Sequence, residues 1–258
     1  MNYNIVFIGA GNLATHLSQA LQKSGNNIIQ VYSKTEANAK TLANKLDASY
    51  ICNIDKINTD ADLYIFALKD EVIPSILNQA ILKNKLLIHT AGSLPIEIFN
   101  QYTNNFGCIY PLQTFSKNRD VDFSQIPIFI EGNNNNVTEI LKEIALQLSN
   151  NVVEIDSISR AKLHLSAIFA CNFANHLFTI AADILKSSNL NFDYLKPLII
   201  ETTQKILEIP PLQAQTGPAM RNDQNIMQKH LDLLADNKDY QNLYRFVSES
   251  IVNMHFNK

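Results

Sequence analysis

The amino-acid sequence predicts an α/β fold, in which a doubly wound parallel sheet is followed by an all-α C-terminal domain. Over 5–155, short apolar runs alternate with amphipathic segments of helical period, which is typical of a parallel sheet with helices on both faces. From Ser157 onward only helical patterns occur. We therefore expect a nucleotide-binding domain over 1–156 and a helical domain over 157–258. One continuous domain with a helical extension is the alternative.

The individual elements follow from apolar runs and from helical spacing. Ile5–Ile8 is a continuous apolar run, as a strand buried on both faces of a sheet requires. In the next segment Leu13, Leu17 and Leu21 recur at helical spacing, and Gly25 ends the helix. The remaining strands are expected over 28–32, 63–68, 86–89, 108–110, 128–130 and 152–155, and the helices over 12–24, 36–46, 72–80, 137–148, 159–187, 192–207, 222–234 and 239–254.

Composition excludes several classes of partner. The 258 residues carry a net charge of −3, which gives no electrostatic reason to expect nucleic acid or a membrane surface as a partner. The N-terminus lacks the basic start of a signal peptide, and its apolar run is too short to span a bilayer. Cys52, Cys108 and Cys171 stand too far apart for a disulfide framework or a metal site. We therefore expect a cytoplasmic protein with buried thiols and no bound metal.

The turn after the first strand has the pattern of a dinucleotide site. Gly9–Ala14 reads Gly-Ala-Gly-Asn-Leu-Ala and matches G-x-G-x-x-A between an apolar strand and an amphipathic helix. Gly9 permits the tight turn, and Gly11 lets the backbone approach a pyrophosphate at the helix N-terminus. This predicts a Rossmann fold; a turn without a ligand is the alternative. The residues expected at the cofactor are Gly9, Ala10, Gly11, Asn12 and Leu13.

The end of the second strand predicts NADP rather than NAD. NAD binders usually place an acidic residue there to hold the ribose hydroxyls. Here Ser33, Lys34 and Thr35 place two hydroxyls around a cation, which suits a ribose 2′-phosphate. The alternative is that Lys34 is an ordinary solvated charge.

Two later strand ends are expected to complete the cofactor crevice, because ligands lie outside the carboxyl ends of parallel strands. The residues concerned are Ala67, Leu68 and Lys69 after one strand and Thr90 after the next. For the neighbouring His89 we favour a structural role over a catalytic one.

The long helix over 159–187 carries a polar stripe. At about 100° per residue, His164, Asn172 and Asn175 fall within roughly 80° of arc. Polar groups on a mostly buried surface must bond to each other or to a ligand. His164 would donate a proton when hydride reduction creates an alkoxide or amine, and Asn172 would orient the substrate. A packing network between helices is the alternative.

Two loops supply further candidates. In the loop that follows Tyr110, Gln113 can reach a substrate. In the loop 215–223, Arg221 is the best anchor for a substrate carboxylate, while Asp223 is expected to cap the next helix. The alternative for Arg221 is an ion pair with Asp223 or with a partner subunit.

These motifs together resemble the Rossmann-like NADP-oxidoreductase proteins that have a C-terminal helical domain of unknown function. They are distant relatives of pyrroline-5-carboxylate reductase, prephenate dehydrogenase and the 3-hydroxyisobutyrate/6-phosphogluconate dehydrogenases. The resemblance covers essentially the whole chain. It is carried by Pro111–Phe115, by His164 with Asn172, and by Gly217 and Pro218 with Arg221 and Asp223.

The resemblance implies a homodimer that pairs through the helical domain. The family loop has a His where this chain has Tyr110, so either Tyr110 substitutes for that His or the chemistry is altered. We expect an NADP-dependent oxidoreductase that transfers a hydride to or from a small carbonyl or imine that bears a carboxylate. A non-catalytic NADP sensor or interaction protein is the alternative. A methyltransferase is disfavoured by the missing acidic residue and the helical tail.

Overall fold

The computed structural model describes residues 2–80 and 82–256. Contacts within the chain divide it into two compact units, Met1–Asn172 and Phe173–Lys258.

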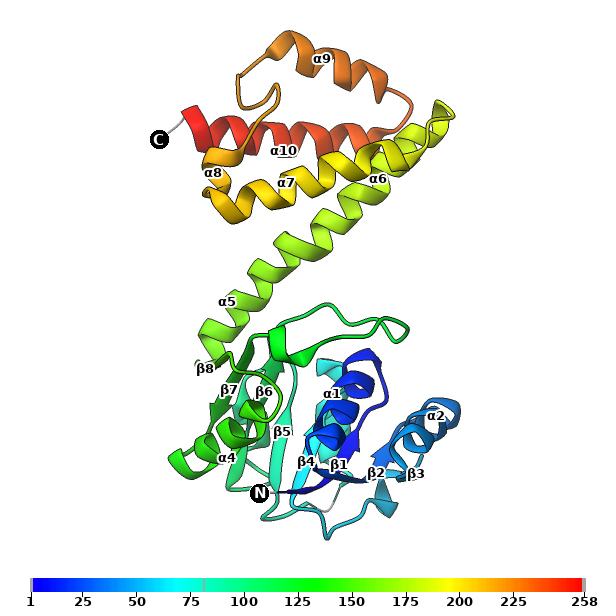
Figure 1. The fold of residues 1–258 in the computed structure, drawn as a ribbon, viewed down its shortest axis with the longest axis vertical. Helices are drawn as coiled ribbons and strands as arrows, with labels where there is room; N and C mark the ends of the chain where they lie inside the picture. The colour runs from blue at the N-terminus through cyan, green and yellow to red at the C-terminus, as the bar shows by residue number, and fades with distance from the viewer. Residues whose placement is uncertain (1, 81, 257–258) are drawn as a thin grey trace. The chain divides into compact units, whose positions relative to one another are not determined.

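The first unit is built on one eight-stranded sheet with the strand order β3-β2-β1-β4-β5-β6-β7-β8 (Figure 1). This order, with strands added outward on both sides of β1, confirms the expected doubly wound α/β fold. The strands are β1 (Asn4–Ile8), β2 (Asn27–Tyr32), β3 (Ser49–Ile51), β4 (Leu63–Phe66), β5 (Leu86–His89), β6 (Asn105–Pro111), β7 (Ile128–Gly132) and β8 (Val152–Glu154). The helices around them are α1 (Asn12–Lys23), α2 (Glu36–Leu46), α3 (Ile73–Leu77) and α4 (Asn135–Leu146).

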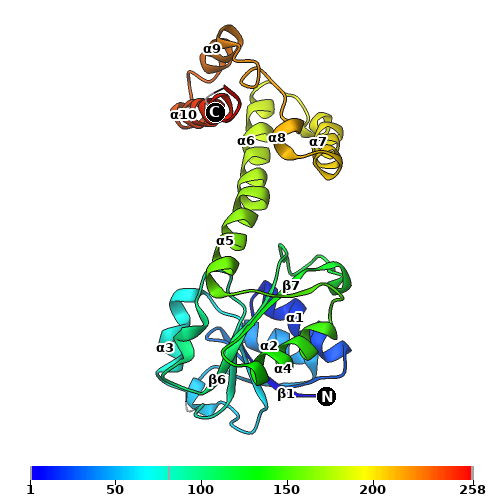
Figure 2. The same cartoon turned by 90° about the vertical axis from the view of Figure 1, so that its left-hand side faces the viewer.

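Helices cover both faces of the sheet, as Figure 2 shows for α3 on one side and α1 and α4 on the other. Ile5 and Phe7 of β1 pack into the core under α1, α2 and α4. Val6 and Ile8 pack into the second core, under α3 and the short 3-10 turns. Because successive side chains of a strand point to opposite faces, a strand with a core on each side must be apolar throughout.

The sheet departs from the all-parallel arrangement at one pair of strands. β7 runs antiparallel to β6, with Ile109 opposite Ile130. Two parallel neighbouring strands must be joined by a connection that crosses one face of the sheet, and this connection is usually a helix. The connection 112–127 contains only a 3-10 turn, Phe123–Gln125, so the chain turns back beside β6. The three-residue edge strand β3 was not anticipated by the sequence.

After β8 the chain is helical, as expected. α5 (Ser157–Ala167) and α6 (Ala174–Ser187) are joined by a π-helical segment, Ile168–Phe173, where a single uninterrupted α-helix was predicted. The other helices are α7 (Lys196–Glu208), α8 (Pro211–Ala214), α9 (Gln224–Leu233) and α10 (Lys238–Phe256). Among the described residues, the stretch Ser157–Ser187 is long and apolar enough to cross a membrane by length and composition alone.

The cysteines differ from expectation in their exposure. All three are free, and Cys108 is buried in β6, but Cys52 and Cys171 are exposed. Cys52 follows the edge strand β3, and Cys171 lies on the π-helical segment outside the sheet. The expectation of buried thiols is therefore wrong for these two residues.

Candidate functional site

The first glycine of the turn allows two strands to approach each other closely. Gly9 has φ +124°, and a Cβ there would lie 2.2 Å from the carbonyl oxygen of Ala67. Its N–H donates to the carbonyl of Tyr32 at 2.8 Å. Gly9 thus joins the carboxyl ends of β1, β2 and β4, and a side chain at this position is incompatible with the fold.

The second glycine has space that the protein does not fill. Gly11 has an extended backbone with φ −79° and ψ −169°, and a Cβ there would meet nothing within 4 Å. Gly11 is the N-cap of α1, whose first turn carries no acidic residue. The first N–H groups of a helix have no partner within the helix, so they form an anion site at its N-terminus. The open backbone and the free donors fit a pyrophosphate.

The loop after β6 lies against the start of α1. Asn12 Nδ2 donates to the carbonyl of Phe115 at 2.9 Å, and His16 Nε2 lies 2.9 Å from the carbonyl oxygen of Ser116. The rings of His16 and Phe115 are stacked, with centroids 5.6 Å apart. This places the loop that bears the exposed Gln113 beside the glycine turn. The sequence contained no signal for the tether through His16.

The three residues after β2 are accessible to a ligand. Lys34 and Thr35 are exposed, and Thr35 is the N-cap of α2. The Ser33 hydroxyl accepts a hydrogen bond from the Thr35 N–H at 3.3 Å. The nearest acidic residue in sequence, Glu36, accepts a hydrogen bond from the Tyr50 hydroxyl at 3.3 Å. A cation, two hydroxyls and a helix N-terminus are suited to a phosphate.

The residues expected at the next two strand ends lie in the loops after β4 and β5. Strand β4 ends at Phe66, earlier than predicted, so 67–69 belong to a loop. Ala67 and Leu68 are half-buried and Lys69 is exposed. Thr90 is 6% exposed, and its N–H donates to the carbonyl of Phe66 at 3.2 Å.

His164 of α5 packs against the loop that follows β5. A Cβ on Gly92 would lie 2.5 to 2.7 Å from His164 ring and side-chain atoms, so the ring occupies the space that the glycine leaves. The Tyr110 hydroxyl lies 2.9 Å from His164 Nδ1, and the two rings are nearly perpendicular. The structure therefore brings together His164, Tyr110 and Gly92.

Tyr110 can fix the tautomer of His164. Burial raises the pKa of the Tyr110 hydroxyl, a larger effect than the lowering by Arg160, so the hydroxyl keeps its proton. A protonated hydroxyl can donate to Nδ1, and the neutral imidazole then carries its own proton on Nε2. Tyr110, which stands where the family loop has a His, is thus a hydrogen-bond partner of His164.

His89 is enclosed in the protein. The residue is fully buried, its ring lies 5.8 Å from that of Phe99, and burial lowers its pKa from 6.5 to about 3, with the charge of Arg160 contributing. This environment supports the structural role.

The burial of His89 predicts acid sensitivity. The folded protein keeps this imidazole neutral, whereas the unfolded chain binds a proton below about pH 6.5, so stability falls as the pH drops from 6.5 toward 3. Between pH 7 and pH 5 we expect His89 to account for about 2 kcal/mol of lost unfolding free energy. Urea unfolding measures the free energy of unfolding at the two pH values. The decrease between pH 7 and pH 5 should be smaller by this amount in His89→Gln than in the wild type. Equal losses would contradict this role.

The remaining candidates are exposed. Asn172 lies in the π-helical segment, which has more residues per turn than an α-helix, so the 100° spacing used to align it with His164 is wrong there. Asn172 and Asn175 are exposed, contrary to the expectation of a mostly buried stripe. Arg221 belongs to the second unit and is exposed. Asp223 caps α9 as predicted, accepting from the Ile226 N–H at 3.1 Å.

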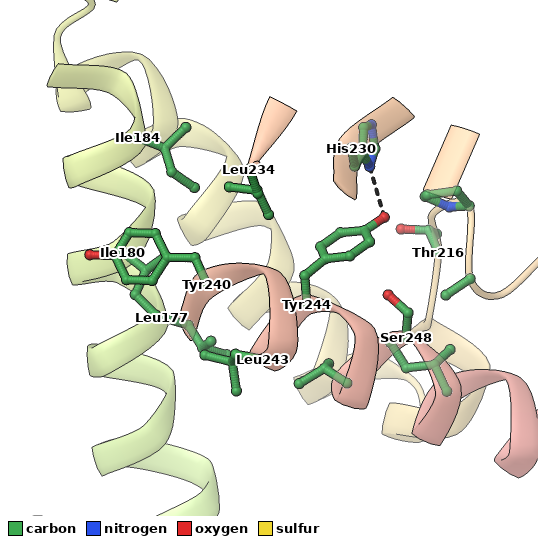
Figure 3. Close-up of a pocket in the computed structure, with 14 residues that line it drawn as sticks. Leu177, Ile180, Ile184, Thr216, His230, Leu234, Tyr240, Leu243, Tyr244 and Ser248 are labelled. Carbon is green, nitrogen blue, oxygen red and sulfur yellow. Dashed lines mark hydrogen bonds between the residues drawn. The ribbon is translucent and has the colours of Figure 1, made fainter. Parts of the chain in front are cut away.

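The second unit has a cavity of its own, shown in Figure 3, with a volume of about 320 Å³. Its walls are mostly apolar side chains of α6 and α10, such as Ile180 and Leu243. His230 and Tyr244 form a polar corner, where the Tyr244 hydroxyl lies 2.8 Å from His230 Nδ1. The loop before α9 also lines the cavity, through Thr216 and Pro218.

Sequence reasoning missed the residues that hold α5 in place. Arg160 is 1% exposed, and its Nη1 donates to Glu131. Both positions look like ordinary surface charges in the sequence, because no local pattern distinguishes a buried charge from a solvated one.

Two family descriptions match the chain. Residues 4–92 match the family described as NADP oxidoreductase, coenzyme F420-dependent. Residues 126–251 match a domain of unknown function (DUF2520). None of the curated proteins matches the chain.

Solved structures are similar over almost the whole chain. A putative NADP oxidoreductase from Bacteroides fragilis is 46% identical, with 98% of each chain covered and a TM-score of 0.91. A protein from Thermotoga maritima is 21% identical, with 96% of each chain covered and a TM-score of 0.71. A reductive aminase from Aspergillus terreus, in complex with NADPH and ethyl-5-oxohexanoate, is 13% identical, with 98% of this chain and 95% of that chain covered and a TM-score of 0.75. The last two likenesses concern the fold alone.

Proposed function

Because the chain belongs to the family of NADP oxidoreductases with this helical C-terminal domain, we propose that it reduces a small carbonyl or imine compound with NADPH. The observation that carries the proposal is the contact of His164 with Tyr110 and Gly92 in the sheet unit that holds the glycine turn. The reductive aminase that shares the fold is bound to NADPH and a keto ester, which is consistent with this substrate class.

The proposed cofactor site follows the carboxyl edge of the sheet. The backbone from Gly9 to Leu13 would hold the pyrophosphate at the open face of Gly11. Lys34, with the hydroxyls of Ser33 and Thr35, would hold the 2′-phosphate. The loops over 67–69 and at Thr90 would border the rest of the cofactor. NADPH supplies a hydride to the substrate carbon when it is bound.

In the proposed reaction, His164 provides the proton. Hydride addition to a carbonyl or imine leaves a negative charge on oxygen or nitrogen, which must be neutralised by a proton. Nδ1 of His164 faces the Tyr110 hydroxyl, so Nε2 holds the proton that is transferred to the substrate. The Tyr110 hydroxyl passes its own proton to Nδ1 in the same step, so that the imidazole stays neutral, and water returns a proton to the pair after the product leaves. Tyr110 also keeps the ring in one orientation during this step.

The proposed substrate bears a carboxylate. Arg221 presents an exposed guanidinium, which binds carboxylates through two parallel hydrogen bonds. Gln113 and Asn172 supply exposed amides that can orient the carbonyl or imine group. In this proposal 1–156 is the cofactor domain and 157–258 is the substrate and dimerisation domain.

A substrate screen tests the function. NADPH oxidation is followed at 340 nm against a panel of small keto acids and cyclic imines, with and without amines. Turnover of at least one compound that His164→Ala abolishes is the expected result. NADPH binding without turnover of any compound by the wild type would favour the alternative, a non-catalytic NADP sensor.

Lys34 is predicted to set the cofactor preference. Lys34→Asp removes the cation and adds an anion that repels a 2′-phosphate, so NADPH affinity should fall by about 10- to 100-fold while NADH affinity holds or rises. Fluorescence titration with both cofactors measures the ratio. The matched control is Lys40→Asp, which makes the same charge change at an exposed position of α2. Equal losses in both variants would point to general electrostatics instead.

We also propose that the protein is a cytoplasmic homodimer that pairs through the helical domain. In the second unit few side chains are buried, among them Ile180 and Met227, while Leu207, Leu233 and Phe246 are 73 to 85% exposed. Apolar surface on this scale marks a contact with another protein or with a membrane. Free cysteines agree with a reducing compartment. Sedimentation equilibrium should give twice the mass of one chain; a monomer at micromolar concentration would contradict the dimer.

A further inference from the structure

We propose that Arg160 and Glu131 are positioning residues: their buried ion pair fixes α5 on the loop after β5 and thereby holds His164 in place. The inference rests on the proposed role of His164. It concerns residues that touch neither the substrate nor the cofactor in the function proposed above.

The ion pair lies at the point where α5 begins. The side chain of Arg160 is 1% exposed and that of Glu131, on β7, is 14% exposed. Nη1 of Arg160 donates to Glu131 Oε2. The Glu131 carboxylate also accepts from the N–H and the hydroxyl of Ser157, at 2.9 and 2.7 Å. The carboxylate thus binds the first residue of α5 as well as the guanidinium.

The same network holds the loop after β5. Nη2 of Arg160 donates to the carbonyl of Leu94 at 2.5 Å and to the Ser157 hydroxyl at 3.1 Å. The Ser157 hydroxyl accepts from the Ile96 N–H at 3.2 Å. Gly92, against which His164 packs, precedes Leu94 by two residues. One guanidinium therefore links β7, the first turn of α5 and the loop that faces His164.

Helix geometry extends this anchoring to His164. Arg160 and His164 are four residues apart on α5, so their side chains lie on the same face, one turn from each other. His164 must lie within hydrogen-bond distance of Tyr110 while fitting against Gly92. A small rotation or slide of α5 would break both contacts. Arg160, one turn earlier on α5, prevents this movement.

The composition of the network favours positioning over stability. A buried ion pair adds little net stability, because the loss of hydration offsets the attraction between the charges. A planar guanidinium with directional bonds to a carboxylate and a carbonyl does restrict geometry. A lysine has one flexible ammonium group and cannot make these bonds from two nitrogens at once.

The test compares Arg160→Met, Arg160→Lys and Glu131→Gln with Lys162→Met, a control at an exposed position of the same helix. The first readout is the set of imidazole ¹⁵N chemical shifts of His164 in the full-length protein, which report the tautomer. The wild type and Lys162→Met should show one tautomer with the proton on Nε2. Arg160→Met and Glu131→Gln should show averaged shifts, and Arg160→Lys should be intermediate.

The second readout is kinetic. We expect kcat to fall by roughly 10- to 100-fold in Arg160→Met, because small displacements of a catalytic group have effects of this size, while KM for NADPH changes less than about threefold. If Arg160→Met does not fold, Glu131→Gln and Arg160→Lys carry the test. Folded variants with wild-type imidazole shifts would overturn the proposal. The imidazole shifts require no substrate, so a wild type with one tautomer but no turnover would count against the proposed function alone.

Discussion

Gly11→Ala is expected to lower NADPH affinity by about 100-fold or more while leaving the fold intact. The new methyl group meets no protein atom within 4 Å, and the backbone at Gly11 is of an ordinary extended kind that alanine adopts without strain. The methyl group would instead occupy the space where a pyrophosphate must approach the backbone. Loss of two or more charge-assisted hydrogen bonds corresponds to about 3 kcal/mol. Fluorescence titration gives the affinity, and urea unfolding gives the stability.

The matched control is Gly9→Ala, two residues away. Its methyl group would lie 2.2 Å from the Ala67 carbonyl oxygen, at a φ of +124° that alanine rarely adopts. We expect roughly 4 kcal/mol or more of lost stability, or failure to fold. The two variants therefore distinguish Gly11, which the ligand requires, from Gly9, which the fold requires. Unchanged NADPH affinity in a folded Gly11→Ala protein would refute the proposed pyrophosphate position.

His164→Gln is expected to reduce kcat by about 10²- to 10⁴-fold, the usual effect of removing a general acid. Glutamine retains a polar side chain of similar length, so α5 and the contact with Gly92 should persist. NADPH affinity should change little, because the proposed pyrophosphate and 2′-phosphate contacts follow β1 and β2, whereas Tyr110, the partner of His164, lies on β6, three strands from β1. Rapid-mixing kinetics with the compound found in the screen measures the chemical step directly. A kcat within threefold of the wild type would exclude His164 as the proton donor.

Tyr110→Phe tests which of the two residues, Tyr110 or His164, donates the proton. It removes the hydroxyl that lies 2.9 Å from His164 Nδ1 but keeps the ring that packs against the imidazole. If Tyr110 orients His164, kcat should fall less than in His164→Gln, and the double variant should be no worse than His164→Gln alone. If Tyr110 is itself the donor, as its place in the family motif allows, Tyr110→Phe should be the more damaging change.

The sequence predicted the cofactor half of the protein well because its signals are local. Runs such as Ile5–Ile8 have no polar residue, which requires a strand with a core on both faces. The positions of Gly9 and Gly11 between a strand and a helix predict a dinucleotide turn, and the absence of an acidic residue after β2 favours NADP. Each of these inferences uses residues within one strand, turn and helix.

Only the tertiary structure decided how β7 pairs, where the long helix is interrupted and what surrounds His164. The partner of His164, Tyr110, is 54 positions away in the chain, and Glu131 is 29 positions from Arg160. No periodicity connects such residues, because hydrophobic patterns report which face of an element is buried and not which side chain it meets. The amino-acid sequence therefore identifies an NADP oxidoreductase fold, whereas the surroundings of His164, the proposed proton donor, depend on contacts that exist only after the strands and α5 have packed.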